Sequence, residues 1–240
     1  MYWKLDEMKV NVVCVWWGDK YDESFVRILH AMVGRHLSIP HTFWVYTDHD
    51  HEFHDGIKVI PIQIEGSVAH MNKYHLWSSD VMPNNNPTLL FDLDVVVKGS
   101  IDHLFDDIRP GMITLAPARW TDWMGGVQAN SSVMGWVPGT IDDVFENFGG
   151  REFELEMKYL GIDRSLWHEY NDRVALFADG NIYSRMLGID QERNMIAREG
   201  YVNWHIDWPV CIFNGVGLLT DHDYNDLDPY KQYEHHRRLD

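Results

Sequence analysis

The sequence predicts an α/β fold with a mixed, mostly parallel central sheet covered by helices. Apolar, β-branched segments alternate with segments of helical periodicity through the first half of the chain, an order typical of parallel sheets. Strand-like segments continue, less regularly, in the second half. No internal repeat, low-complexity tract or Gly/Ser-rich linker interrupts the chain. We therefore expect a single domain over 1–240, with peripheral segments at 1–9 and about 222–240.

Five elements are predicted in the first third of the chain, in the order strand, helix, strand, strand, helix. The strands are rich in β-branched and aromatic residues, and Pro61 places the third at an end or edge of the sheet. Apolar side chains on one face, from Phe25 to Met32, predict the first helix. The second helix would turn Tyr74 and Trp77 inward. These elements are expected over residues 10–17, 23–36, 41–47, 57–62 and 71–82.

The next segment, residues 87–97 (PTLLFDLDVVV), places Asp92 and Asp94 inside an apolar run. The apolar residues on both sides of the aspartates predict strand. Beyond this run the same reasoning predicts four strands and helices before a last strand. In chain order these are strands 112–118 and 131–137, helices 140–148 and 181–187, and strand 209–213.

The charge of the chain limits its partners. Lys and Arg number 20 against 37 Asp and Glu, a net charge of −17. This argues against nucleic acid as a partner, because phosphates must be neutralised by basic side chains. A phosphate compound would need positive charge from another source, and a divalent cation held by carboxylates is the simplest one.

The cysteines and the apolar segments indicate the compartment. Cys14 and Cys211 lie in apolar segments without metal-site or C-x-x-C spacing, as is typical of buried thiols in a reducing compartment. The first ten residues have no apolar signal-peptide core. The apolar run 10–17 is too short to span a bilayer, and no transmembrane segment is predicted. We expect a soluble, cytoplasmic protein.

An Asp-x-Asp pattern is weak evidence by itself, because the chain has 25 Asp and contains the pattern four times. Asp92 and Asp94 are distinguished by their apolar surroundings. On a strand both would face the same side, and unpaired buried carboxylates are costly. A hard divalent cation, Mn²⁺ or Mg²⁺, would meet that need. The alternative is that the two side chains cap a turn between strands and accept backbone N–H bonds.

The stretch LLFDLDVVVKGSIDHLF resembles the metal-binding segment of nucleotide-sugar glycosyltransferases of the A-type fold. The resemblance is to the family that contains glycogenin and the bacterial lipopolysaccharide galactosyltransferases. It implies a Rossmann-like nucleotide-sugar-binding domain, with the metal on Asp92 and Asp94 and a short helix in the segment that follows them.

Other segments follow in the family's order and imply donor-binding residues. WGDKYDESF supplies Gly18, Asp19 and Tyr21, of which the tyrosine would pack on the uracil ring of a uridine diphosphate (UDP) sugar. Lys73 matches a basic residue near the phosphates and sugar. NSSVMGW, from Asn130, matches the strand that comes after the metal segment. Together with Asp92, these five residues form the expected donor site.

The catalytic and C-terminal motifs match less fully. FADGNIYSRML resembles the segment that faces donor sugar and acceptor, and implies Asp179 and Asn181 as catalytic residues. IFNGVGLLT has Asn214 where the family has a metal-binding histidine, followed by Gly215 at the donor, and it lacks the family's Lys-Pro-Trp. The third metal ligand could instead be His205, Asp207 or water.

The resemblance implies an enzyme that transfers a hexose from a nucleotide sugar, with retention of configuration, to a hydroxyl of a glycan, lipid-linked or protein acceptor. An alternative is a module that binds a nucleotide sugar or glycan without turnover. A nucleotidyltransferase ranks lower, because WWGDKYDE has one glycine and more acids than bases. Trp120, Trp123 and Trp136 could line an acceptor groove or fill the core. We interpret TDHDHEFHD as a solvated loop.

Overall fold

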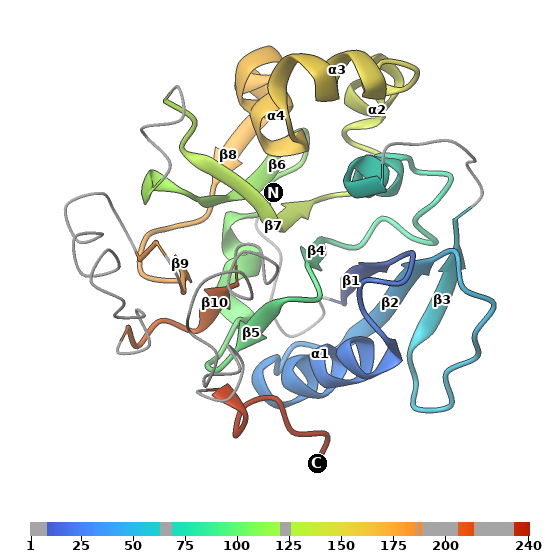
Figure 1. Ribbon diagram of the computed structural model, residues 1–240, viewed down its shortest axis with the longest axis vertical. Coiled ribbons are helices and arrows are strands. Elements are labelled where there is room, and N and C mark those ends of the chain that lie inside the picture. Colours follow the sequence, from blue (N-terminus) through green and yellow to red (C-terminus); the bar gives the residue numbers. More distant parts are fainter. Residues whose placement is uncertain (1–8, 63–68, 121–125, 186, 189–205, 214–232) are drawn as a thin grey trace.

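The computed structural model describes residues 9–62, 69–120, 126–185, 187–188, 206–213 and 233–240 (Figure 1). Two sheets organise the described chain, one of seven strands and one of three. The strands are β1 (Val10–Trp16), β2 (His41–Thr47), β3 (Lys58–Pro61), β4 (Thr88–Phe91), β5 (Val95–Val97), β6 (Ile113–Pro117), β7 (Ala129–Trp136), β8 (Val174–Leu176), β9 (Ile182–Ser184) and β10 (Val210–Ile212). The helices are α1 (Glu23–His36), α2 (Asp142–Phe148), α3 (Glu152–Tyr159), α4 (Ile162–Glu169) and the 3₁₀ turns η2 (Ala69–Trp77), η3 (Asp102–Asp107) and η5 (Asn171–Arg173).

The seven-stranded sheet has the order β3-β2-β1-β4-β7-β6-β8. Four of its six pairings are parallel, and the two that involve β7 are antiparallel. The second sheet, β5-β10-β9, begins where the chain leaves β4. The predicted mixed, mostly parallel α/β fold is therefore confirmed.

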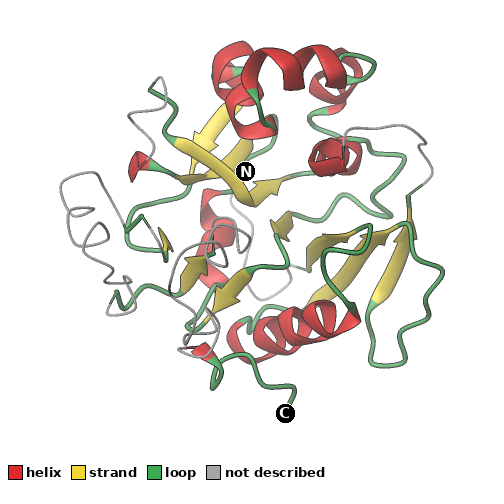
Figure 2. Cartoon of the chain, in the orientation of Figure 1, coloured by secondary structure: helices red, strands yellow, loops and turns green. Residues whose placement is uncertain are grey.

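Helices cover both faces of the larger sheet (Figure 2). The side chains of β1 alternate between these two faces. Val12 and Cys14 belong to the core that α1 covers, while Val13 packs with η2, α2 and α4 on the other face. The strands β5, β9 and β10 contribute to the α1-side core. One apolar core thus joins both sheets.

The first helix begins and ends where the sequence predicts. Asp22 caps its N-terminus, accepting a hydrogen bond from the Ser24 backbone N–H at 2.8 Å. Its buried side chains are Val26, Leu29, Met32 and Val33. The predicted stripe is therefore displaced by about one position, which leaves Phe25 and Ile28 half-buried at the margin of the core.

One predicted element is wrong. Residues 181–187 were expected to form a helix, but Ile182–Ser184 form the strand β9. This strand pairs in parallel with β10, Ile182 opposite Val210, and its three residues are buried. Pairing with a distant strand overrides the local helical pattern here. The helices α3 and α4 and strand β8 were not predicted.

The described end of the chain packs against α1. Tyr233 is buried and shares a hydrogen bond of 2.9 Å with the Tyr183 hydroxyl. The Arg35 guanidinium donates to the backbone carbonyls of His236, Arg238 and Asp240. Within the described residues, no helix combines the length and apolarity needed to cross a membrane.

The central sheet is packed tightly enough to give a test of the fold. An alanine Cβ at Gly135, on β7, would lie 2.6 Å from Ile108 Cγ1 and 3.1 Å from Phe177 Cζ. We expect Gly135→Ala to lower the free energy of unfolding by about 1–3 kcal/mol, as overpacked cores do. Gly34→Ala, in the exposed interior of α1 with no heavy atom within 4 Å, should raise it by about 0.5–1 kcal/mol.

Urea unfolding followed by circular dichroism measures both effects. The two variants carry the same chemical change, so a common effect on the unfolded chain cannot explain opposite signs. Equal stability of Gly135→Ala and the unmodified protein would contradict the described packing of β7 against Ile108.

Candidate functional site

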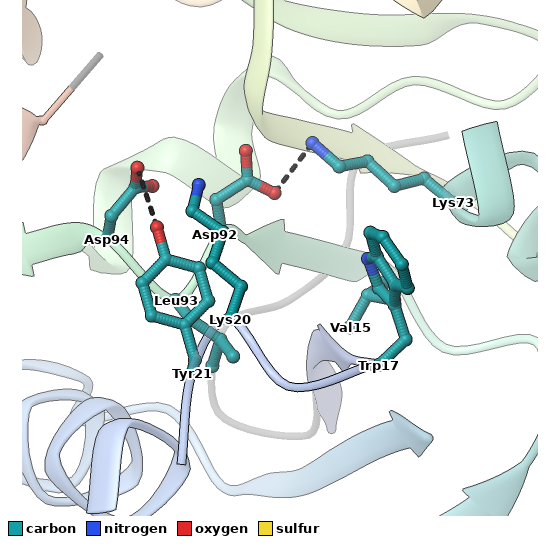
Figure 3. A pocket seen from close by; sticks show the side chains of 8 residues that line it. All are labelled: Val15, Trp17, Lys20, Tyr21, Lys73, Asp92, Leu93 and Asp94. Carbon is teal, nitrogen blue, oxygen red and sulfur yellow. Dashed lines mark hydrogen bonds and ion pairs between the residues drawn. The ribbon is translucent and has the colours of Figure 1, made fainter. Parts of the chain in front are cut away.

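A pocket of about 160 Å³ lies at the carboxyl ends of β1 and β4 (Figure 3). In parallel sheets this edge is where ligands bind. Three of its residues follow β1, three follow β4, and the others come from β1 and η2. The lining residues are Val15, Trp17, Lys20, Tyr21, Lys73, Asp92, Leu93 and Asp94.

The two aspartates lie in a turn rather than on a strand. The turn joins β4 to β5, and the Val95 N–H donates to the Asp92 carbonyl at 3.1 Å. Backbone bonds fix it on both sides, from Asp92 N–H to Ser132 O at 2.9 Å and from Phe213 N–H to Asp94 O at 3.3 Å. The predicted strand geometry is wrong, but both carboxylates still line one pocket because the chain changes sheets at this turn.

The carboxylate of Asp94 is desolvated and lies close to a like charge. The residue is 9% exposed, and burial and then the charge of Asp92 raise its pKa from the ordinary 3.8 to about 6. Lys20, Lys73 and a hydrogen bond from the Tyr21 hydroxyl, 3.3 Å long, oppose this rise. Asp94 therefore ionises at a free-energy cost that added positive charge would offset.

Asp92 and Lys73 form a close ion pair. Lys73 Nζ lies 2.6 Å from Asp92 Oδ1 and donates a second bond, 3.1 Å long, to the carbonyl of Ser131 on β7. The Lys73 side chain is 12% exposed. This lysine therefore holds one oxygen of Asp92 and links η2 to β7.

The carboxylate pair suits a hard divalent cation. Two oxygen ligands that repel each other in a partly buried pocket are the chemistry that Mg²⁺ or Mn²⁺ uses, with substrate phosphates and waters as further ligands. Among the described residues no group of three or more His, Cys, Asp or Glu could hold a metal. The predicted third ligand Asn214, its alternative His205 and the donor residue Gly215 lie outside the described residues. Burial lowers the pKa of Lys98, and the charge of Asp207 opposes that fall. Asp207 does not line the pocket.

The loop between β1 and α1 brings Tyr21 to the pocket. The Tyr21 hydroxyl contacts Asp94, and its ring centroid is 4.8 Å from that of Phe25. Gly18 has a left-handed backbone, φ +59°, and its N–H donates to the Asp48 carboxylate at 3.3 Å. Asp19 is exposed and does not line the pocket. Of the three loop residues expected at the donor, Tyr21 therefore lines the site.

The histidine-rich loop after β2 is largely exposed, and three of its rings, those of His49, His51 and Phe53, pack on or beside Trp16. The His49 ring stacks on Trp16, with centroids 4.0 Å apart and planes 21° apart. His51 meets Trp16 edge-on at 5.7 Å and lies 3.1 Å from Glu23. The interpretation as a solvated loop holds for its acidic residues and His54, which are exposed, while Trp16 offers the half-buried rings a surface to pack on. These rings support the loop that joins β1 to α1, which begins after Trp16.

Asn130 lies on β7, near the ends of the strands that form the pocket. Its Oδ1 accepts a hydrogen bond of 2.9 Å from the Ser132 backbone N–H. The side chain is therefore engaged by its own strand, next to the carbonyl that Lys73 binds. Its expected contact with the donor stays a prediction.

The two residues predicted as catalytic do not line this pocket. Asp179 forms an ion pair of 2.9 Å with Arg119, and both side chains are more than half exposed. Asn181 is buried, with its amide oxygen 2.7 Å from His103 Nε2 and its amide nitrogen donating to Ala178 O. These contacts hold the segment before β9, and the catalytic roles stay predictions.

Two charged residues were not predicted. Lys20 lines the pocket and lies in the loop WGDKYDESF, where the family pattern implies Gly18, Asp19 and Tyr21. Asp163 lies at the start of α4, an unpredicted helix. Burial raises its pKa, and the Arg164 N–H and the charge of Lys73 oppose the rise. Asp163 does not line the pocket, and its electrostatic interaction with Lys73 makes it a further candidate for the site.

The tryptophans expected at an acceptor groove are divided. Trp120 and Trp136 are 1% and 0% exposed and belong to the two cores, so they serve packing. Trp123 lies outside the described residues.

No family model matches the sequence, and a comparison with curated proteins found no significant match. Solved structures do resemble its fold. The galactosyltransferase LgtC in complex with donor and acceptor sugar analogs has a TM-score of 0.65 at 12% identity, over 94% of this chain and 95% of that one. The apo-form glycosyltransferase GlyE of Streptococcus pneumoniae TIGR4 has a TM-score of 0.65 at 14% identity. That match covers 97% of this chain and 61% of GlyE, so the chain spans about three-fifths of GlyE.

At these identities the likeness concerns the fold. It agrees with the mixed, mostly parallel seven-stranded sheet. The chain has the glycosyltransferase A-type fold, as the Asp-x-Asp segment led us to expect.

Proposed function

We propose that this chain is a metal-dependent glycosyltransferase that moves a sugar from a nucleotide diphosphate sugar to an acceptor hydroxyl. The observation that carries the proposal is the pair of the half-buried Asp92 and the desolvated Asp94, which repel each other where β4 ends in an A-type glycosyltransferase fold. Sugar transfer is also what the names of LgtC and GlyE describe.

The proposed chemistry follows from charge. Asp92 and Asp94 would hold a Mn²⁺ or Mg²⁺ ion, which supplies positive charge to the diphosphate as the glycosidic bond breaks. Lys73 holds Asp92 in place, and Tyr21 holds Asp94. Without positive charge at this turn, a donor would meet the repulsive field of a chain with net charge −17.

The finer features come from the resemblance of the sequence to its family. We propose a UDP-hexose as the donor, with Tyr21 beside the uracil ring, and retention of configuration at the anomeric carbon. The acceptor would be a glycan, a lipid-linked sugar or a protein. A module that binds the donor without turnover is the competing proposal, and slow hydrolysis of the donor with Mn²⁺ separates the two.

The first prediction concerns turnover. The double variant Asp92→Asn/Asp94→Asn should lose metal-dependent hydrolysis or transfer from UDP-sugars by at least about 10³-fold, since both metal ligands lose their charge. The measurement is UDP release from a panel of UDP-sugars with Mn²⁺, Mg²⁺ or EDTA. The double variant of the exposed Asp106 and Asp172 removes the same charge elsewhere and should retain activity. Normal turnover in the first variant would refute the site assignment.

The second prediction concerns stability without metal. Because folding raises the Asp94 pKa from 3.8 to about 6, the stability linked to this carboxyl is full below pH 4 and is lost as pH rises through 6. In EDTA at pH 7.5, Asp94→Asn should be more stable than the unmodified protein by about 2–3 kcal/mol. The difference should disappear near pH 4. Thermal unfolding across this pH range measures it, and a constant difference at all pH values would contradict the assigned cause.

The third prediction separates two candidate acids. Neither aspartate lines the pocket. Asp179 is exposed and paired with Arg119, whereas the half-buried Asp163 interacts electrostatically with Lys73, which does line it. We therefore expect Asp163→Asn to lower kcat by about 10²-fold, the usual contribution of an acid–base group, and Asp179→Asn to lower it by less than about 10-fold. Steady-state kinetics with saturating Mn²⁺ decides between them. The opposite ranking would support the role that the family pattern assigns to Asp179.

A further inference from the structure

The two lysines of the pocket differ in what they contact. Lys73 is largely buried, with its ammonium group 2.6 Å from Asp92 and bound to the Ser131 carbonyl. Lys20 is exposed, and no ion pair of Lys20 is found among the described residues. Its ammonium group lies 4.8 Å from the centroid of the Tyr21 ring. One lysine is therefore committed to a carboxylate, and the other can meet a ligand.

The backbone around Lys20 is fixed. On one side the Gly18 N–H donates to both carboxylate oxygens of Asp48 at 3.3 Å. On the other, Trp16 Nε1 donates to the Tyr21 carbonyl at 2.9 Å. Figure 3 shows the Lys20 side chain directed to the same side of the pocket as the two aspartates. Lys20 is thus held at the pocket, although it lies in a loop.

The charge of Lys20 reaches the carboxylate turn. Of the two lysines, Lys20 lowers the pKa of Asp94 more strongly, even though Lys73 lies against Asp92. A divalent cation bound by the aspartates would repel the ammonium group of Lys20. An anion bound to that cation would attract it.

We propose that Lys20 binds the diphosphate of the donor, while Lys73 positions Asp92. This inference rests on the proposed function and assigns the diphosphate contact to a residue of the first loop. The charges of the pocket support it. The two aspartates and the two charges of a sugar-linked diphosphate exceed the charges of Lys73 and a divalent cation by one, and Lys20 supplies that one. A lysine is well suited to this role, as a mobile point charge with three donors.

The proposal makes two predictions of opposite sign for one variant. Lys20→Met should weaken the binding of UDP, measured calorimetrically at saturating Mn²⁺, by about 10-fold or more, because it loses a charge-assisted bond. The same variant should bind Mn²⁺ alone, measured by electron paramagnetic resonance, at least as tightly as the unmodified protein, because a positive charge near Asp94 is gone. Uridine, which has no phosphate, should bind both proteins equally.

Two further variants serve as controls. Lys20→Arg keeps the charge and should retain most of the UDP affinity. Lys58→Met removes the same charge from an exposed position on the edge strand β3 and should change none of the three affinities. A loss of UDP, uridine and Mn²⁺ binding together in Lys20→Met would indicate a structural role and overturn the proposal.

The outcomes also separate this inference from the proposed function. If the unmodified protein binds UDP with Mn²⁺ and Lys20→Met binds it equally well, Lys20 does not meet the diphosphate, and the proposed function stands. If the unmodified protein binds none of UDP, GDP, CDP and ADP with Mn²⁺, both proposals fail. GDP, CDP or ADP binding without UDP binding would keep the Lys20 test, carried out with that diphosphate and its nucleoside.

Discussion

The repulsion between Asp92 and Asp94 is the constraint on which the arrangement of the pocket depends. Two carboxylates share a partly buried turn, and burial makes the ionised form of Asp94 costly. The surrounding groups offset part of this free-energy cost. Lys73 binds one carboxylate, the Tyr21 hydroxyl binds the other, and Lys20 adds a more distant charge. A fold that keeps this turn must keep these partners or supply a cation.

The partners come from segments far apart in the sequence, and the topology of the sheet brings them together. The parallel pairing of β1 with β4 sets the loop that carries Tyr21 beside the turn that carries the aspartates. The antiparallel pairing of β4 with β7 places the Ser131 carbonyl where Lys73 can reach both it and Asp92. The central sheet therefore positions the two loops that carry Tyr21 and the aspartates, and η2 adds the charge of Lys73.

Much of this arrangement could be predicted from the sequence, because local patterns determine it. Local sequence patterns alone predict the strand that begins at Val10, the capped helix after Asp22 and the candidate site at the aspartates in an apolar run. Other features depend on distant partners. Tyr183 lies in a strand because β10 is beside it, a contact between residues about thirty positions apart.

The site was predicted unevenly for the same reason. The residue types of Asp92, Asp94, Lys73 and Tyr21 follow a pattern along the chain, and all four line the pocket. The environment of Asp163 depends on a helix of only eight residues, which is too short to stand out in the sequence, and on Lys73 from another element. Arg119, the ion-pair partner of Asp179, is sixty positions away, and no local pattern predicts this ion pair.

The carboxylate turn is also the place where the chain passes from one sheet to the other, between β4 and β5. Backbone bonds from Ser132 on one side and Phe213 on the other meet at the same three residues. A cation or ligand that neutralises the aspartates therefore also stabilises the junction between the two sheets. Amide hydrogen exchange at Asp92 and Phe213 would then be slower when the pocket is occupied. Loss of the ligand would allow the smaller sheet to open before the larger one.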